Sequence, residues 1–120
     1  MENEMVGEVK LEIGDGRTLV LRPDFPTLIA IEKKTGKALT RLVWELSEGE
    51  YSIGDLTTIV QLSAQAYGHK LGFRETGEAV IKAGLVNAQL LVLTMLTKSL
   101  MPPEDVVKNS DGPAKEPTTE

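Results

Sequence analysis

The hydrophobic pattern of the chain changes near residue 24 from alternation to helical spacing. Over residues 7–13 three apolar side chains alternate with charged ones, which is typical of a strand with one buried face. Residues 14–17 read Gly-Asp-Gly-Arg and can form a tight turn, and residues 18–22 are a second strand-like run. We predict an antiparallel hairpin. It needs a helix on its apolar face, because two strands alone are only marginally stable.

Two helices are predicted between the hairpin and residue 50. Asp24 can cap the first, Pro26 suits its first turn, and Gly36 supplies its end. A second helix begins at Ala38 and ends at residues 48–50, Glu-Gly-Glu. The residues at helical spacing on the first helix are Phe25, Leu28, Ile29 and Glu32. On the second helix Leu39, Leu42, Val43 and Leu46 form an apolar stripe.

Three more helices are predicted further along the chain. One starts within residues 52–55 and ends at Gly68; its stripe consists of Leu56, Ile59, Val60, Ser63 and Tyr67. Residues 69–75 are interpreted as a connection, and Thr76 as the cap of a short helix. Gly84 breaks or kinks the chain before a last helix over residues 85–101, which Pro102 and Pro103 stop.

These elements predict an α+β fold that is mostly α, with an N-terminal β-hairpin followed by about five short-to-medium helices. The 120 residues suffice for one core. We expect a flexible N-terminus at residues 1–6, a single domain at 7–101 and a disordered acidic C-terminal tail at 102–120. The tail carries five acids against two lysines and only two valines that could anchor it.

Charge and composition exclude several classes of function. The formal net charge of −5 argues against nucleic acid as a partner, and the lack of cysteine removes disulfides and thiolate chemistry. No signal peptide is recognisable, and the longest uncharged stretch, residues 83–97, is shorter than the about 20 residues of a membrane span. We expect no membrane association and a location in the bacterial host cytoplasm.

The sequence offers no convincing active site. His69 is the one histidine and is interpreted as a solvated loop side chain, so no His-based triad can be built. The glycines of residues 14–17 precede a strand and not a helix, which argues against a phosphate loop. The acid pairs at 48/50 and 104/105 are expected to be solvated charges. We predict no enzyme activity, no catalytic or metal-binding residues and no cofactor.

The last helix carries more apolar surface than one core contact needs. Its apolar positions cover an arc of about 280°, of which Leu85, Val92 and Leu96 can face the core. The rest belongs either to a central helix wrapped by the others or to a surface for self-association or a partner. Trp44 lies off the stripe of its helix and either packs under the hairpin or the Tyr51 turn or binds a partner. The candidate partner-binding residues are Trp44, Val86, Leu90, Leu93 and Met101.

The order of these elements resembles a known family. The residues that carry the resemblance are 22–36, Arg-Pro-Asp-Phe-Pro-Thr-Leu-Ile-Ala-Ile-Glu-Lys-Lys-Thr-Gly, followed by a Leu-rich helix ending at 48–50, Asp55-Leu56, and Glu78-Ala79-Val80 before Gly84 and a long apolar helix. Over residues 7–101 the chain is similar to the tail assembly chaperones of tailed phages, of the gene transfer agent type.

The resemblance implies a non-catalytic protein that binds and solubilises the tape measure protein during tail morphogenesis, with the tail tube protein as a second expected partner. The alternative is a minor structural subunit of a tail or connector that remains in the particle. The low strand content argues against the tail tube protein itself, for which a substantial sheet is expected. An accessory subunit of an enzyme is a third hypothesis, since small α-rich domains host many functions.

Overall fold

The computed structural model describes residues 7–101, and all structural statements concern that part of the chain. Two strands precede five helices, in agreement with the predicted mostly α fold. The bounds are β1 Val9–Glu12, β2 Thr18–Leu21, α1 Phe25–Thr35, α2 Leu39–Glu48, α3 Ile53–Tyr67, α4 Phe73–Ala83 and α5 Leu85–Ser99. The predicted N-terminal segment at 1–6 and acidic tail at 102–120 lie outside the described residues.

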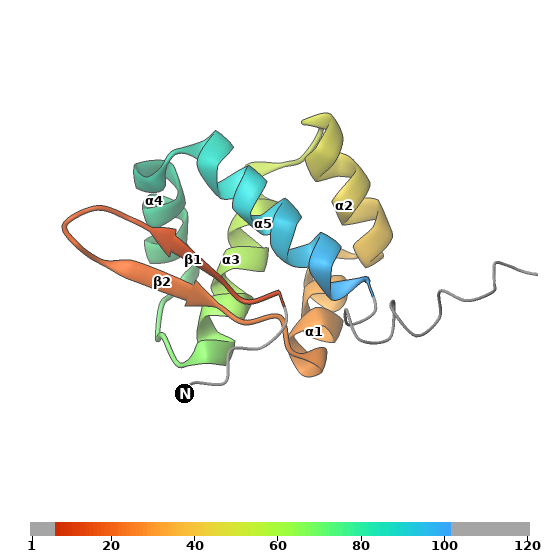
Figure 1. Ribbon diagram of the computed structural model, residues 1–120, viewed down its shortest axis with the longest axis horizontal. Coiled ribbons are helices and arrows are strands. Elements are labelled where there is room, and N and C mark those ends of the chain that lie inside the picture. The colour runs from red at the N-terminus through yellow and green to blue at the C-terminus, as the bar shows by residue number, and fades with distance from the viewer. Residues whose placement is uncertain (1–6, 102–120) are drawn as a thin grey trace, which may run out of the picture.

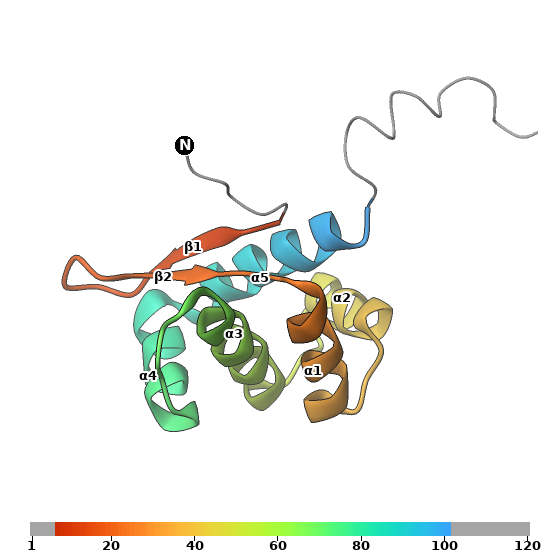
Figure 2. The ribbon, with the colours of Figure 1, turned by 90° about the horizontal axis from the view of Figure 1, so that it is seen from below.

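The hairpin and α5 lie on one side of the molecule, and α1 to α4 lie on the other (Figures 1 and 2). β1 and β2 pair antiparallel, with Leu11 opposite Leu19. Helix α3 packs against β2 and α5 packs against β1, so the apolar face of the hairpin is covered by helices as predicted. Both leucines are buried, because they are on the covered face.

The boundaries of α1, α2 and α3 lie close to the predicted ones, and Asp24 caps α1 as predicted. Asp24 accepts a hydrogen bond from the Thr27 amide at 3.0 Å, and Ser52 does the same for Asp55. These bonds satisfy amide groups that have no partner within the first turn. Gly36 and Gly49 end α1 and α2 in the left-handed conformation, at φ of 72° and 73°.

The start of α4 differs from the prediction. The helix begins at Phe73 and not after Thr76, which is buried and donates its hydroxyl to the Gly72 carbonyl at 2.8 Å. The Glu75 carboxylate accepts from the Gly72 amide at 3.1 Å, the acid half of a capping box. Because glycine supplies no capping side chain, the sequence pattern hid this helix start.

The chain turns sharply between α4 and α5. Gly84 has a φ of 101°, which side chains with a Cβ rarely adopt, and the two helix axes differ by 107°. None of the described helices alone has the length and apolar character of a membrane span; only the bent pair α4 and α5 passes that test together, by length and composition.

The core lies between the two sides of the molecule. Its largest fully buried side chains come from both strands and from all five helices. They are Leu11, Leu21, Ile31, Leu42, Leu46, Leu56, Ile59, Val60, Val80, Val92, Met95 and Leu96. No aromatic residue is among them, so the core is aliphatic, as the scarcity of aromatic residues suggests.

Candidate interaction surface

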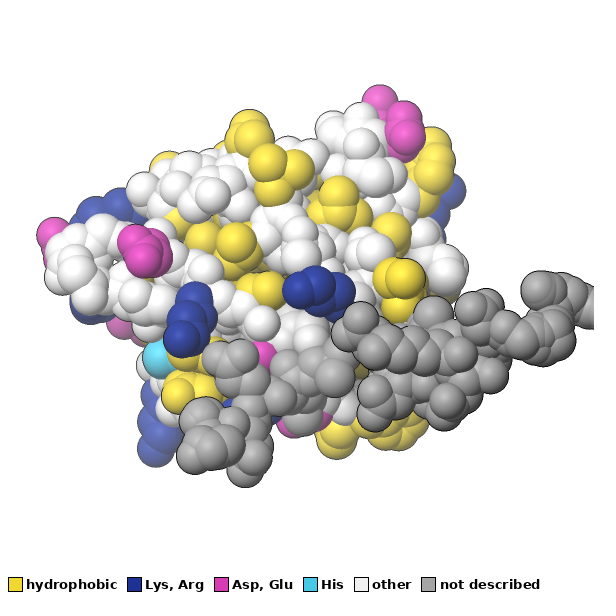
Figure 3. Space-filling view, in the orientation of Figure 1, with side chains coloured by type: hydrophobic (Ala, Val, Ile, Leu, Met, Phe, Trp, Pro, Cys, Tyr) yellow, Lys and Arg dark blue, Asp and Glu magenta, His cyan; other side chains and the backbone are white. Residues whose placement is uncertain are grey.

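The α5 stripe is the surface formed by the four predicted residues Val86, Leu90, Leu93 and Met101. Val86 is 64% exposed, Leu90 55% and Met101, just past the helix end, 57%, whereas Leu93 is half-buried. In the space-filling view hydrophobic side chains form a broken row along α5 (Figure 3). Side chains at spacings of three and four residues share a helix face. The four residues therefore form one elongated apolar surface.

The opposite face of α5 is in the core. Ala88, Val92, Met95 and Leu96 are buried there. Gln89 fixes the helix against α2, since its side-chain amide donates to the Leu46 carbonyl at 2.8 Å and accepts from the Tyr51 hydroxyl at 3.1 Å. Helix α5 is therefore packed on one side only. Of the two interpretations of its wide apolar arc, the wrapped central helix is wrong.

Trp44 does not join the α5 stripe. It lies two residues from both Leu42 and Leu46, which are buried, so it projects from the opposite face of α2. The indole is 50% exposed, and the Arg41 guanidinium lies 5.2 Å from its ring centre. It therefore packs neither under the hairpin nor under the Tyr51 turn. The five predicted residues form two separate surfaces.

An apolar groove between α3 and α4 was not predicted. Ile53, Phe73 and Ile81 line it, each half exposed or slightly more, and its volume is about 540 Å³. The remaining lining residues are Gly54, Thr57, Arg74, Gly77 and Glu78. The sequence missed this α3–α4 groove because residues 69–75 were interpreted as a connection, which left Phe73 outside any helix.

Another apolar surface lies on α1. Phe25 is 74% exposed and Ile29 38% exposed, one turn apart on the same helix face. We call this pair the α1 knob. The predicted spacing on α1 does not mark its buried face, because Thr27 and Ile31 face the core in place of Phe25 and Ile29. A short polar side chain such as Thr27 fits close to a neighbouring helix, and periodicity of apolar residues does not detect it.

His69 holds the hairpin and is not simply solvated. Its Nε2 accepts the amide of Val20 at 3.0 Å, and its ring stacks on Tyr67 at 5.3 Å between centroids. The Arg22 amide donates to the Ser63 carbonyl at 2.9 Å, so two outward amides of β2 bond to α3 and the loop after it. This bonding protects the strand edge from pairing with other chains. The solvated interpretation of His69 is wrong.

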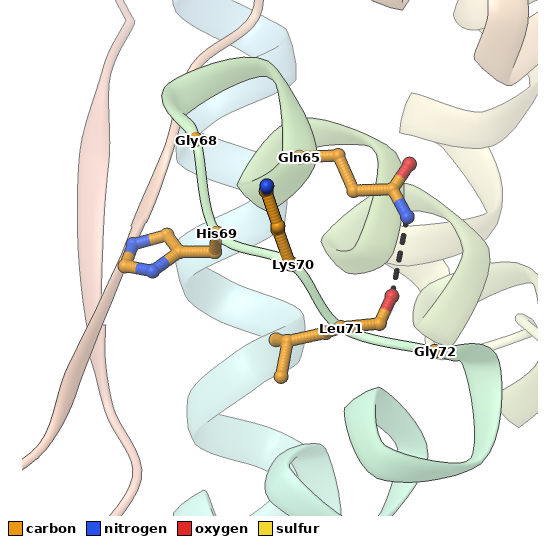
Figure 4. A pocket seen from close by; sticks show the side chains of 6 residues that line it. All are labelled: Gln65, Gly68, His69, Lys70, Leu71 and Gly72. Carbon is orange, nitrogen blue, oxygen red and sulfur yellow. Dashed lines mark hydrogen bonds between the residues drawn. The ribbon is translucent and has the colours of Figure 1, made fainter.

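The loop around His69 forms only a shallow hollow. Figure 4 shows the His69 ring directed at β2, while Gln65 donates to the Leu71 carbonyl at 3.1 Å. The hollow has a volume of about 370 Å³ and is lined by Gln65, Gly68, His69, Lys70, Leu71 and Gly72. Since the imidazole nitrogen nearest the strand is occupied by a main-chain bond, this hollow does not present it to a substrate.

A charged network joins the α1–α2 connection, α2 and α3. Lys37 contacts Glu45 at 3.0 Å and Asp55 at 2.7 Å, and Arg41 contacts Glu45 at 3.0 Å. Hydrogen bonds from Lys37 and then Arg41 lower the pKa of the buried Glu45 carboxyl. Hydrogen bonds to Asp55 and Glu45 raise the pKa of the Lys37 ammonium. These charges are paired with one another, which is the arrangement expected of a structural clamp.

Within residues 7–101 no three His, Cys, Asp or Glu side chains gather in a way that could hold a metal ion. Together these features define a small helical domain with an N-terminal hairpin, whose described residues expose apolar side chains at the α5 stripe, Trp44, the α3–α4 groove and the α1 knob.

The chain belongs to the family of the phage tail tube protein GTA-gp10, whose model matches residues 6–101. No curated protein and no solved structure matches it. The gene transfer agent and phage tail themes of the sequence resemblance are thereby confirmed. The chaperone hypothesis is corrected, because the matching family is one of tail tube proteins and favours a structural subunit. Tape measure binding has no support from this match.

Proposed function

We propose that this protein is a non-catalytic structural subunit of a phage-type tail and that it remains in the finished particle. The family match supports this role. The observation that carries it is the α5 stripe, on which three large apolar side chains are more than half exposed. Large exposed apolar patches usually mark protein interaction sites.

The contacts of this subunit with its neighbours are proposed to be helical. The described residues hold one hairpin whose strands have four residues each, and the outer edge of β2 is bonded to α3 and His69. A sheet continuing from subunit to subunit through β2 would have to break these bonds. The α5 stripe needs no such rearrangement, because its side chains already face outward.

Burial of the α5 stripe against another tail subunit supplies the driving force. Apolar surface removed from water contributes about 25 cal/mol per Å². Side chains such as Val86 and Leu90 lose little conformational freedom when they are covered. The aliphatic stripe therefore suits a permanent contact better than a transient polar one.

Mass spectrometry of purified particles tests this function. The wild-type chain is expected as a stoichiometric component. The amount of a Val86→Asp, Leu90→Asp double variant in the particles is expected to fall by about tenfold or more. The reason is that contact with an apolar neighbouring surface would bury two charges. Asn87→Asp with Thr94→Asp is the matched control, since it adds the same two charges at exposed polar positions of the same helix.

Circular dichroism of the purified variants shows whether the helices persist, as expected for substitutions at exposed positions. If the wild-type chain is absent from finished particles, the structural role is wrong. If the double variant is incorporated as well as the control, the α5 stripe is not the contact surface.

A further inference from the structure

The outer edge of β2 is fastened at two places that differ in their chemistry. Two amides of this edge, those of Val20 and Arg22, bond to groups outside the hairpin. The Arg22 amide donates to a main-chain carbonyl, that of Ser63, at 2.9 Å. The Val20 amide donates to a side chain, at the Nε2 atom of His69, at 3.0 Å. A carbonyl accepts at every pH, whereas an imidazole nitrogen accepts only while it is unprotonated.

The bond to Val20 fixes the state of the His69 ring. Because Nε2 is the acceptor, it carries no hydrogen, and the neutral ring has its hydrogen on Nδ1. The ring stacks on Tyr67, the titratable residue that α3 places against it, and Figure 4 shows the ring directed at β2. The fold therefore uses the neutral form of a type of side chain that changes its charge between about pH 5 and 8.

We propose that His69 is a pH-sensitive latch on the edge of β2. When Nε2 takes a proton from water, the lone pair that accepted the Val20 amide is occupied, and the charged ring has two donors and no acceptor. Two N–H groups then face each other, so the bond breaks. The bond from Arg22 to Ser63 does not depend on this proton, and the edge opens at Val20 alone.

The surroundings of the protonated ring do not replace the lost bond. The residues that line the hollow beside it include no carboxylate, and Lys70 is the charged residue among them. On β2, Arg22 is paired with the Glu8 carboxylate at 2.8 Å, and on β1 Lys10 is opposite Val20. These neighbours are cations or are already paired. The imidazolium therefore gains no new ion pair where the neutral ring had a hydrogen bond.

The opening is local. Leu19 and Leu21, on either side of Val20, are buried and keep the strand on the helices. The hairpin turn is also joined to α4, by Asp15 and Lys82 at 3.2 Å. Release of His69 therefore frees the Val20 amide without unfolding the hairpin. Since an unpaired edge amide is the group to which an incoming extended chain bonds, the protonated state offers a main-chain donor that the neutral state withholds.

Amide hydrogen exchange of the full-length protein tests the latch, followed residue by residue by NMR between about pH 5 and 8. The protection factor of Val20, which corrects for the intrinsic pH dependence of exchange, should fall by about tenfold or more on acidification. It should follow the same curve as the ring proton shifts of His69, because one proton causes both changes. The Arg22 amide is the matched internal control, since its carbonyl acceptor does not titrate, and its protection should be unchanged.

Two variants separate the latch from a general effect of acid. His69→Ala removes the acceptor, so protection of Val20 should already be lower than in the wild type by about tenfold or more at neutral pH. His69→Gln supplies an acceptor that does not titrate, so protection of Val20 should not change over the same pH range. His69 is outside the aliphatic core, and circular dichroism should show unchanged helix content in both variants.

The inference is overturned if wild-type protection of Val20 is the same before and after His69 titrates, or if Arg22 loses protection equally. An equal loss on acidification in His69→Gln would show that the ring is not the cause. Full protection of Val20 in His69→Ala would show that His69 does not hold the edge. None of these results depends on whether the chain is present in particles, so the structural role proposed above is tested separately.

Discussion

Helices α3 and α5 have the same length, 15 residues, and both are rich in apolar residues, yet they occupy different positions in the fold. α3 contacts β2, α1, α4 and α5, and its exposed large apolar residues, Ile53 and Tyr67, are at its two ends. α5 packs on one face and exposes Val86 and Leu90 along the other.

Small side chains on α3 accompany its close packing. The buried residues of α3 include Thr57, Ser63 and Ala64, which let neighbouring elements approach closely. A Cβ at Gly77 of α4 would lie 3.6 Å from the Thr57 methyl group, an ordinary contact that shows how near the two helices are. α5 carries larger aliphatic residues on its outer face. Apolar content alone therefore does not identify the central helix.

The largest expected effect is on the free energy of unfolding, when a leucine is truncated in α3 and in α5. Leu56→Ala in α3 removes a fully buried side chain and should lower the free energy of unfolding by about 2–5 kcal/mol. Leu90→Ala in α5 makes the same chemical change at a position 55% exposed and should cost less than about 1 kcal/mol. Urea denaturation followed by circular dichroism measures both. Similar losses would show that the α5 stripe is packed in solution.

A second comparison concerns how the two helices begin. The first turn of α3 is fixed by the Ser52 cap and by Asp55, which contacts Lys37, whereas α5 follows Gly84 with no side-chain cap.

The ion pairs around Lys37 can be tested at Glu45 in α2. Glu45→Gln should destabilise the protein at neutral pH, because Lys37 and Arg41 lose a buried partner. The effect should be smaller than that of Leu56→Ala, since Lys37 keeps Asp55.

The pH dependence of stability checks the role of Glu45. Because its pKa is lowered in the folded state, its contribution is present above the ordinary value of about 4.5 and is lost as the pH falls through the lowered pKa. The Glu45→Gln protein should lose less stability than the wild type on acidification below that value. Glu78→Gln, which breaks an exposed pair, is the control and should leave the profile unchanged. Identical profiles for all three proteins would contradict the network.

The smallest expected effect is at Ser63 in α3. Its hydroxyl is buried and has no hydrogen-bond partner among the described residues, while its carbonyl bonds to Arg22. Ser63→Ala should raise the free energy of unfolding by about 0.5–1.5 kcal/mol, because an unsatisfied polar group is removed and alanine favours helix. Ala64→Ser, the reverse change at the next buried position, should lower it. A loss of stability in Ser63→Ala would show that the hydroxyl has a partner in solution.

Much of the fold was predictable because its signals are local. The hairpin turn, the Asp24 and Ser52 caps and the left-handed glycines at the ends of α1 and α2 depend on residues within a few positions of one another. The start of α4 was not predictable, because its capping bond joins the Glu75 carboxylate to the main-chain amide of Gly72. For the candidate site, the sequence predicted the α5 stripe as one helix face. It also placed Trp44 off the buried face of its own helix, but it did not find the α3–α4 groove.

By itself the sequence determined the element order, the aliphatic core and the excess of apolar surface on the last helix, because periodicity and capping act over one or two turns. Only the tertiary structure decided that α3 is central, that Phe25 faces outward while Thr27 is buried, and that His69 closes the edge of β2. Each of these depends on residues far apart in the chain: His69 and Val20 are 49 positions apart. Which apolar faces are covered is decided when the helices pack, because several faces compete for one small core.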